Sequence, residues 1–362
     1  MRVALVHDWL VTWRGGEKVL EALLTLYPDA PIYTLFYDPS KMPASLRDRK
    51  IIVHPYANRL RFMRKALLPL MPLWIESFPL EHYDLVISTS SCVAKGVMVG
   101  PSTKHLSYIH SPMRYVWDQR DEYFGRLRHL PFIGLMIEAG CAILRLWDTV
   151  SASRVNLFIA NSRFVKLRIQ KYYGRDAAVV HPPINVDRFR PNVYPKKEGY
   201  LLAAGALVSY KRFDLAIQAA EKLGKKLIVA GSGPELAKLR RMGGTNTTFV
   251  NSPSDGQWVE LLQKADALLF PGVEDFGMVA VEAMAAGTPV VAYRAGGALD
   301  FIIEETTGVF FNEATPEALA DAIDRAGSIS WNQDALSRQA EAFDLEAFLR
   351  GVKRQLEILL SR

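Results

Sequence analysis

Residues 270–293 read FPGVEDFGMVAVEAMAAGTPVVAY, and this stretch predicts a strand that leads through an acidic turn into a short helix and a second strand. The apolar run 265–270 that enters it is bounded by Pro271 and Gly272, as is typical of a buried parallel strand. Parallel strands joined through a helix indicate an α/β fold.

The helix of this stretch is expected over residues 279–286, which are helix-forming and are followed by Gly287, a residue suited to end a helix. The turn 274–278 is therefore expected at the carboxyl end of one strand and at the start of a helix. Open α/β sheets bind their ligands at that edge. Free N–H groups and the helix dipole favour an anion there, most often a phosphate.

Two carboxylates, Glu274 and Glu282, accompany this predicted anion site. They would repel a bare phosphate, but they suit a ligand that carries hydroxyls as well as phosphates, such as a nucleotide sugar. The alternative is an ordinary strand, turn and helix with two solvated glutamates, and the two glutamates alone leave that alternative open.

The whole pattern PxxEDFGxxxxEAMAxGxPVVA resembles the E-x7-E signature of the retaining glycosyltransferases of family 4, which have the GT-B fold. The resemblance implies that Glu282 binds the nucleotide ribose and that Glu274 lies against the donor sugar. It also implies that backbone amides meet the sugar and the phosphate, namely those of Phe276, Gly277, Met278 and Val279.

Length and composition predict two globular domains. The chain has 362 residues, of which 49% are hydrophobic and 23% charged, without the signature of disorder. Cys92 and Cys141 are too few for a disulfide framework, and no segment reaches the roughly 18 uninterrupted apolar residues of a membrane span. Since the N-terminus reads as a strand and not as a signal peptide, we expect a cytoplasmic protein, with a peripheral position on the inner face of the cell membrane as an open possibility.

Strand and helix signals alternate along both halves of the chain, which predicts two Rossmann-like, doubly wound domains facing a cleft. The expected strands are 3–7, 31–37, 83–90, 104–110, 157–162, 177–184, 199–205, 225–231, 246–251, 265–272 and 289–293. The expected domains are 1–185 on the acceptor side and 199–343 on the nucleotide-sugar side, joined by a proline-rich linker at 186–198. Residues 344–362 predict an amphipathic helix with Leu345, Phe348, Val352, Ile358 and Leu359 on one side, and the resemblance implies that it packs on the N-terminal domain.

Two further motifs are expected in the first domain. Gly15 and Gly16 stand at a strand-to-helix turn, where the family places a Gly-Gly turn that faces the donor diphosphate and the acceptor, although a turn serving chain geometry alone is an equal alternative. His110 ends an apolar strand, at a position where the family has a histidine near the transferred sugar; an isolated histidine there more often packs against the strand end. The segment HSPMRYVWD (110–118) resembles O-antigen mannosyltransferases, whose donor is GDP-mannose.

Lys211 and Arg212 follow the first strand of the second domain, where cations suit a departing diphosphate. The family usually reads G-R-L-x-x-x-K-G here, so Lys211 matches, whereas Ala206 replaces the arginine and Arg212 replaces the glycine. Whether Arg212 supplies the missing charge stays open. Gly231 and Gly233 form a further strand-end turn, which the resemblance places near the nucleotide.

No metal and no cofactor are expected, because the chain has no D-x-D motif and no clustered His, Cys and Asp ligands. Residues 1–190 hold 26 Lys and Arg against 16 Asp and Glu, a net charge of +10, so an anionic partner is expected for the first half.

Basic and apolar residues interleave over 59–74, and 126–147 could extend this pattern. The pattern fits either a core helix with a basic edge or a patch on an anionic membrane. The apolar interleaving and the lack of a recognised motif argue against nucleic acid.

The resemblance as a whole implies a retaining transferase that moves a hexose to a glycan or polyprenyl-linked acceptor in cell-surface polysaccharide synthesis. The segment 110–118 implies that this hexose is mannose and that the donor is GDP-mannose. Lys211 and the amides of 276–279 would stabilise the leaving diphosphate, while Glu274 and His110 would orient the sugar. A nucleotide-sugar 2-epimerase of the same fold and a non-catalytic nucleotide-sugar-binding protein are the alternatives.

Overall fold

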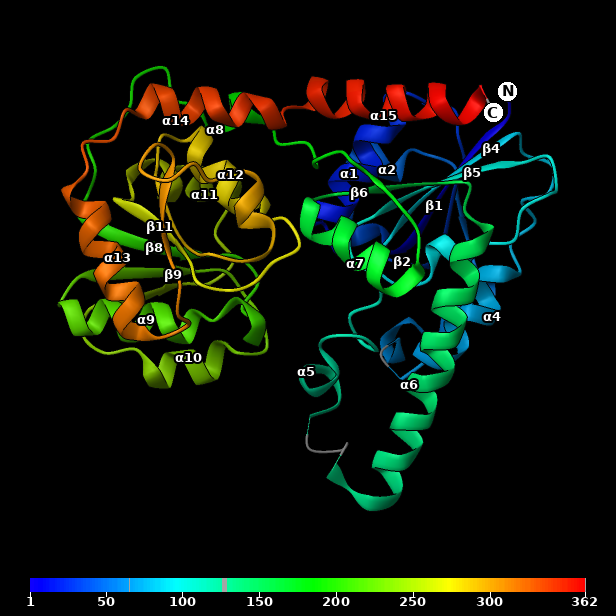
Figure 1. The fold of residues 1–362 in the computed structure, drawn as a ribbon, viewed down its shortest axis with the longest axis horizontal. Coiled ribbons are helices and arrows are strands. Elements are labelled where there is room, and N and C mark those ends of the chain that lie inside the picture. The colour runs from blue at the N-terminus through cyan, green and yellow to red at the C-terminus, as the bar shows by residue number, and fades with distance from the viewer. Residues whose placement is uncertain (65, 126–128, 362) are drawn as a thin grey trace. The chain divides into compact units, whose positions relative to one another are not determined.

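The computed structural model describes residues 1–64, 66–125 and 129–361, and it divides into two compact units. Unit 1 comprises Met1–Pro183 and Phe348–Arg362, and unit 2 comprises Ile184–Ala347 (Figure 1). The change of unit at Ile184 falls within the proline-rich stretch that follows the last strand of unit 1.

Unit 1 is built on a parallel seven-stranded sheet in the order β3-β2-β1-β4-β5-β6-β7. Its strands are β1 (Val3–Leu10), β2 (Ile32–Tyr37), β3 (Ile51–Val53), β4 (Leu85–Ser90), β5 (Lys104–Ile109), β6 (Leu157–Ala160) and β7 (Ala178–Val179). Its helices are α1 (Gly15–Leu24), α2 (Ala44–Arg47), α3 (Pro55–Arg59), α4 (Met71–Glu76), α5 (Arg120–Phe124), α6 (Pro131–Ser151), α7 (Arg163–Tyr173) and α15 (Leu345–Leu360).

Two hydrophobic clusters cover the two faces of this sheet. One joins the strands to α1 and α15, and the other joins them to α4 and α6. Because both faces are covered, the strands are apolar nearly throughout, as is expected of a parallel sheet.

The C-terminal helix α15 packs on unit 1 and closes one of these clusters. Its buried side chains are Phe348, Val352, Leu356 and Leu359, which recur at helical spacing. The sequence analysis was wrong at the start of this face, because Leu345 is 40% exposed and Leu356 is buried in addition to the predicted residues. The core face is therefore displaced by part of a turn from the predicted one.

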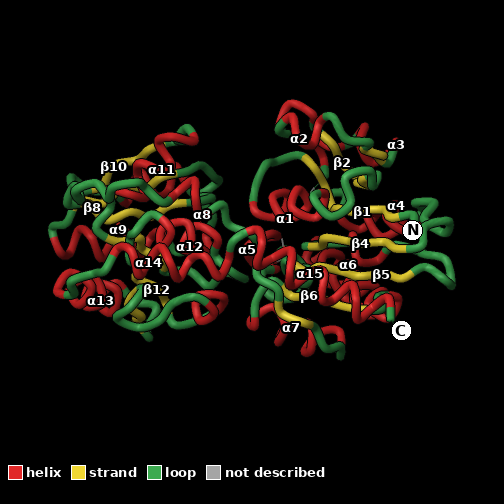
Figure 2. The backbone as a smooth tube through the Cα atoms, turned by 90° about the horizontal axis from the view of Figure 1, so that it is seen from above, coloured by secondary structure: helices red, strands yellow, loops and turns green. Residues whose placement is uncertain are grey.

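Unit 2 is built on a parallel six-stranded sheet in the order β10-β9-β8-β11-β12-β13. Figure 2 labels β8, β10 and β12 of this sheet. Its strands are β8 (Tyr200–Ala204), β9 (Lys226–Ala230), β10 (Thr247–Val250), β11 (Ala267–Phe270), β12 (Val290–Tyr293) and β13 (Gly308–Phe311). Its helices are α8 (Val186–Phe189), α9 (Phe213–Leu223), α10 (Leu236–Met242), α11 (Asp255–Lys264), α12 (Met278–Ala285), α13 (Pro316–Ser328) and α14 (Gln333–Ala340). Helices α9, α10 and α13 pack on one face, and α8, α11, α12 and α14 on the other.

Each predicted strand overlaps a strand of the structure, and the two strands that were not predicted lie at sheet edges. β3 and β13 are only three and four residues long, and such short apolar runs carry little periodicity. β1 also runs further than predicted, through Asp8. The carboxylate of Asp8 accepts hydrogen bonds from the backbone N–H groups of residues 91–94 at 2.6–3.0 Å, which satisfies a charge inside the strand.

Candidate functional site

Two loops of unit 2 meet at the carboxyl edge of its sheet. β8 and β11 are neighbours, and the loops that follow them carry Lys211 and Glu274. The ammonium of Lys211 lies 2.8 Å from Glu274 Oε1, and the two side chains are only 11% and 16% exposed. The structure therefore pairs two of the predicted site residues directly, in surroundings that strengthen the attraction relative to bulk water.

Glycines make this close approach possible. Gly205 has φ +136°, and a Cβ added to it would lie 2.8 Å from the Lys211 ammonium. A Cβ on Gly272 would lie 2.5 Å from Lys211 Cα. A side chain at either position would displace Lys211 from Glu274, so the glycines set the geometry of the ion pair.

Gly231 and Gly233 have a structural reason to be glycine. A Cβ on Gly231 would lie 1.9 Å from Gly205 O, and one on Gly233 would lie 2.3 Å from Leu207 O. The backbone of Leu207 also donates to Ser232 O at 2.9 Å. The turn after β9 thus supports the loop that carries Lys211, and its contact with a nucleotide stays a prediction.

The turn that carries Glu274 leads into α12, whose N-cap is Gly277 with φ +106°. Phe276, Met278 and Val279 stand with Gly277 at this helix start, as the sequence predicts, and the first N–H groups of a helix have no partner within it. The loop after β12 braces the turn, because the Gly297 N–H donates to Glu274 O at 2.9 Å. The turn is therefore fixed from two sides.

Glu282 lies on α12 and is buried, with 5% exposure. Its Oε2 accepts a hydrogen bond at 3.0 Å from the indole N–H of Trp258 on α11. A carboxylate that is held in this way presents a fixed acceptor to ligand hydroxyls. Trp258 was not predicted, because no sequence motif distinguishes a tryptophan that contacts a site carboxylate from one that packs in the core.

Arg212 adopts a left-handed backbone with φ 54°. Glycine favours that conformation, which accounts for the usual glycine of the resembled motif at this position. The guanidinium lies against Asp214, with Nε–Oδ1 and Nη2–Oδ2 distances of 3.0 Å. Its charge is thus balanced by a neighbour on α9, whereas Lys211 pairs with Glu274.

Unit 1 brings Gly16 and His110 together. His110 directly follows β5, and its N–H donates to Ser90 O at 2.9 Å. A Cβ on Gly16 would lie 3.5 Å from His110 Nε2 and 3.6 Å from His7 Cε1. Gly15 is the first residue of α1 beside them. The predicted glycine turn and the predicted histidine therefore share one place at the sheet edge.

His7 was not predicted as part of this group. It is buried in β1, and its Nδ1 lies 2.6 Å from Thr89 Oγ1. Desolvation, and next the neighbouring His110, lower the pKa of His7 to about 3, so the ring is neutral at physiological pH. A histidine that interrupts an apolar strand was the available signal.

Glu17 follows the glycine pair on α1 and is buried as well. It accepts hydrogen bonds from Arg14 N at 3.0 Å and from Thr12 Oγ1 at 3.1 Å. Burial raises the pKa of Glu17 to about 7 in spite of these bonds. The first turn of α1 therefore contains a carboxyl that titrates near neutral pH.

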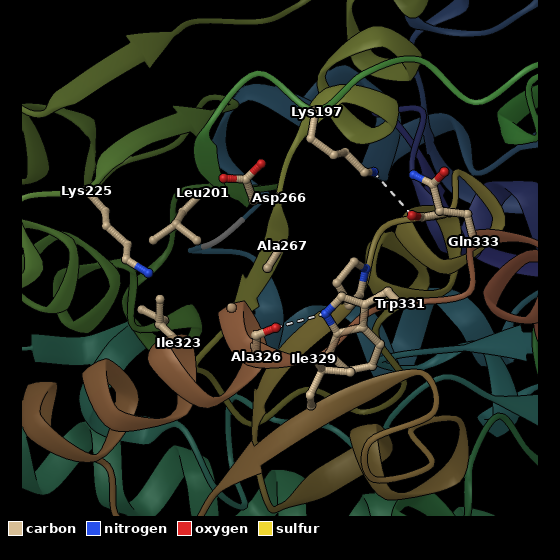
Figure 3. A pocket seen from close by; sticks show the side chains of 13 residues that line it. Lys197, Leu201, Lys225, Asp266, Ala267, Ile323, Ala326, Ile329, Trp331 and Gln333 are labelled. Atoms are coloured by element: carbon tan, nitrogen blue, oxygen red, sulfur yellow. Dashed lines mark hydrogen bonds between the residues drawn. The ribbon is translucent and has the colours of Figure 1, made fainter.

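A cavity of about 430 Å³ in unit 2 lies at the opposite sheet edge, by the amino ends of β8 and β11 (Figure 3). Its lining includes Lys197, Asp266 and Trp331, and it contains none of the predicted site residues. Since ligands of parallel sheets bind at the carboxyl edge, this cavity is separate from the candidate site.

Over residues 1–64, 66–125 and 129–361, the structure has no group of three or more His, Cys, Asp or Glu side chains that could hold a metal. Cys92 and Cys141 are buried and unpaired with each other. Asp118, the last residue of HSPMRYVWD, pairs with Arg168 and Tyr172.

Comparison with known proteins finds similarity to glycosyltransferases. Residues 186–343 match the family model of Glycosyl transferases group 1. Human alpha-1,3/1,6-mannosyltransferase ALG2 is 26% identical over 417 residues, which cover 99% of this chain and 96% of that protein. A D-inositol 3-phosphate glycosyltransferase of Mycobacterium tuberculosis is 34% identical over 190 residues, 46% of this chain and 40% of that one.

Among solved structures, HepE of Anabaena in complex with UDP is similar with a TM-score of 0.71 at 17% identity, covering 99% of this chain and 100% of that chain. The fold is accordingly GT-B, with two Rossmann-like parallel-sheet domains, as predicted. The chain is glycosyltransferase-like in sequence and in fold.

A first prediction concerns Arg212. Arg212→Gly should keep affinity for a nucleoside diphosphate within about twofold, because Lys211 is the expected contact of the diphosphate, and should raise the free energy of unfolding by about 1 kcal/mol through relief of the left-handed backbone. Calorimetric titration and urea unfolding measure the two effects. A loss of affinity of about tenfold or more (~1.4 kcal/mol) would instead assign Arg212 the missing charge.

A second prediction follows from the raised pKa of Glu17. The pKa of Glu17 in the folded protein, about 7, exceeds its ordinary value of 4.5. Protonated Glu17 therefore makes its full contribution to the free energy of unfolding below pH 4.5, and the wild type loses this contribution as the pH rises towards 7. Glu17→Gln keeps an acceptor for the Arg14 N–H but does not titrate. Its free energy of unfolding relative to wild type should therefore rise over this window, by up to about 1.4 kcal/mol per pH unit. Urea unfolding across this range checks it, and a difference independent of pH would contradict it.

Proposed function

We propose that the protein is a hexosyltransferase that takes its sugar from a nucleotide sugar, and that unit 2 binds this donor. The observation that carries the proposal is the buried Lys211–Glu274 pair, 2.8 Å long, at the carboxyl edge of the sheet beside the start of α12. The full-length similarity to a mannosyltransferase and the UDP bound to the Anabaena protein support it.

The leaving group of such a reaction is a nucleoside diphosphate, whose negative charge grows as the bond to the sugar breaks. The Lys211 ammonium and the N–H groups at the start of α12 offer the matching positive charge. When a diphosphate displaces Glu274 from Lys211, the released carboxylate can accept hydrogen bonds from sugar hydroxyls. The ion pair thus holds both groups in place before the donor arrives.

Glu282 suits the ribose of the nucleotide. A carboxylate accepts hydrogen bonds from two adjacent hydroxyls, and Trp258 fixes the orientation of this one. Its burial beside α12 limits competition from water.

The finer assignment is a metal-independent transfer with retention of configuration, in which the acceptor attacks the face that the diphosphate leaves. The proposed donor is GDP-mannose, and the proposed acceptor is a glycan or polyprenyl-linked glycan in cell-surface polysaccharide synthesis. His110, Gly15 and Gly16 are the proposed contacts from unit 1. The proposed location is the cytoplasm, at the inner face of the membrane.

Two other activities use the same donor chemistry. A nucleotide-sugar 2-epimerase would convert the donor without an acceptor, and a non-catalytic binding protein would convert nothing. A panel of GDP- and UDP-sugars, screened by thermal shift at equal concentration, identifies the ligand, since a ligand that binds the native state more tightly raises the melting temperature further. Incubation with the stabilising donor alone, and then with a polyprenyl-linked glycan acceptor, separates the three activities.

The third prediction tests the site within this assay. Trp258→Phe removes one hydrogen bond to a charged group and should weaken donor binding by about 10- to 100-fold. Trp331→Phe is the matched control, because the Trp331 indole donates to Ala326 O at 2.9 Å beside the other cavity. We expect the control to bind the donor like wild type.

Equal weakening in both variants would show a general loss of stability and not a donor contact. An epimerised sugar nucleotide formed from donor alone would overturn the transferase assignment. A Glu282→Ala variant that folds and transfers at the wild-type rate would overturn the role of Glu282.

A further inference from the structure

Helix α6 is held on one side only. It has 21 residues, hence a length of about 32 Å. Its inner side buries Cys141 and Leu144 in the cluster shared with α4. The buried ion pair of Lys95 with Asp148, 3.0 Å long, fastens the helix to the loop after β4.

The opposite side of α6 is exposed and apolar. Phe132 and Met136 are 85% and 71% exposed, and the same side continues to the last turn of the helix. At 100° per residue the positions of this side fall within about 100° of the helix surface. The α6 outer face, as we name it, comprises Phe132, Leu135, Met136, Ala139, Ile143, Leu146 and Val150.

A second set of exposed apolar side chains belongs to a segment that packs on the same core cluster. Its exposed side chains are Tyr56, Phe62, Met63, Leu70 and Leu73, in the segment 56–73. Leu68 and Met71 anchor this segment in the cluster that also receives Leu144 of α6. Large exposed apolar patches on soluble proteins mark surfaces that contact a partner or a membrane.

The charge of the segment identifies the partner. Arg59 and Arg61 are exposed beside Phe62 and Met63, and Arg64 is half-buried; Lys65 lies outside the described residues. Residues 49–75 contain no Asp or Glu. Aromatic and apolar side chains interleaved with arginine are suited to the headgroup region of an anionic bilayer.

We propose that the α6 outer face and the segment 56–73 together dock on the surface of an anionic lipid bilayer. The proposal deepens the proposed function and rests on it only for the lipid-linked acceptor, which such docking brings to the protein. No described helix is long and apolar enough to cross a membrane, and α6 itself contains Glu138, Arg145 and Asp148. The contact is therefore peripheral.

A second copy of α6 is the competing occupant, because the stripe from Phe132 to Val150 has the spacing of a coiled-coil seam. The flanking positions Ile133 and Ala142 are uncharged and widen the apolar face, so no charge pairs would specify a helical partner. The irregular, basic segment 56–73 also has no counterpart in a two-helix seam. These features favour the bilayer.

The fourth prediction is tested by sedimentation of the full chain with vesicles of phosphatidylcholine, with and without phosphatidylglycerol. We expect binding only when phosphatidylglycerol is present. Arg59→Gln with Arg61→Gln should weaken the partition coefficient by about 30-fold. The control, Lys353→Gln with Arg354→Gln, makes the same charge change on exposed positions of α15 and should leave binding near wild type.

The apolar contribution is tested by Phe132→Ser, Met136→Ser and Leu146→Ser together, which should reduce vesicle binding by at least about 100-fold. The matched control exchanges Leu167, Val193 and Leu360, which are exposed elsewhere, for serine. Because the assay contains no nucleotide sugar, its result is independent of donor binding, which titration measures on the same variants.

The proposal is supported if the arginine and serine variants lose vesicle binding while both control variants keep it. Wild-type protein that stays in the supernatant with anionic vesicles overturns it. A wild-type dimer in sedimentation velocity, which the serine variant converts to a monomer without any vesicle binding, assigns the face to a second copy and also overturns it.

Discussion

Lys211 and Glu274 come from loops that follow neighbouring strands, and their ion pair depends on two glycines: Gly205 leaves room for the Lys211 side chain, and Gly272 lets the two loop backbones approach. The turn after β9 supports the first loop through Gly231, and the loop after β12 supports the second through Gly297. Four strand ends are thereby fixed around one cation and one carboxylate. This arrangement is suited to a ligand that carries both a diphosphate and hydroxyl groups.

The sequence predicted those parts of the molecule whose signals are local. The apolar runs and the strand-to-helix turns fixed the parallel sheets, and the spacing of Glu274 and Glu282 placed both carboxylates at the start and on the body of α12. Edge strands β3 and β13 were missed because their runs are too short to show a period. The predicted core face of α15 differed from the observed one because the helix begins at Leu345, before the point at which its side chains first pack on unit 1.

The remainder depends on contacts between residues far apart in sequence. No local pattern shows that Trp258 donates to Glu282, or that Asp214 engages Arg212 and leaves Lys211 to Glu274. The sequence left open whether residues 126–147 form a core helix or a surface patch, and the exposure of α6 becomes evident only once its neighbours are placed. The pKa values of His7 and Glu17 depend on burial, which sequence alone does not supply.

Calorimetric titration of wild type and Lys211→Met with GDP and GMP tests the central claim most directly, because the two nucleotides differ by one phosphate. The account predicts that wild type prefers GDP and that the variant loses about 10- to 100-fold in GDP affinity while its GMP affinity stays near wild type. Lys238→Met, at an exposed position of α10, is the control and should retain the preference. A Lys211→Met protein that still prefers GDP to the wild-type extent would contradict the assignment of the diphosphate to this lysine.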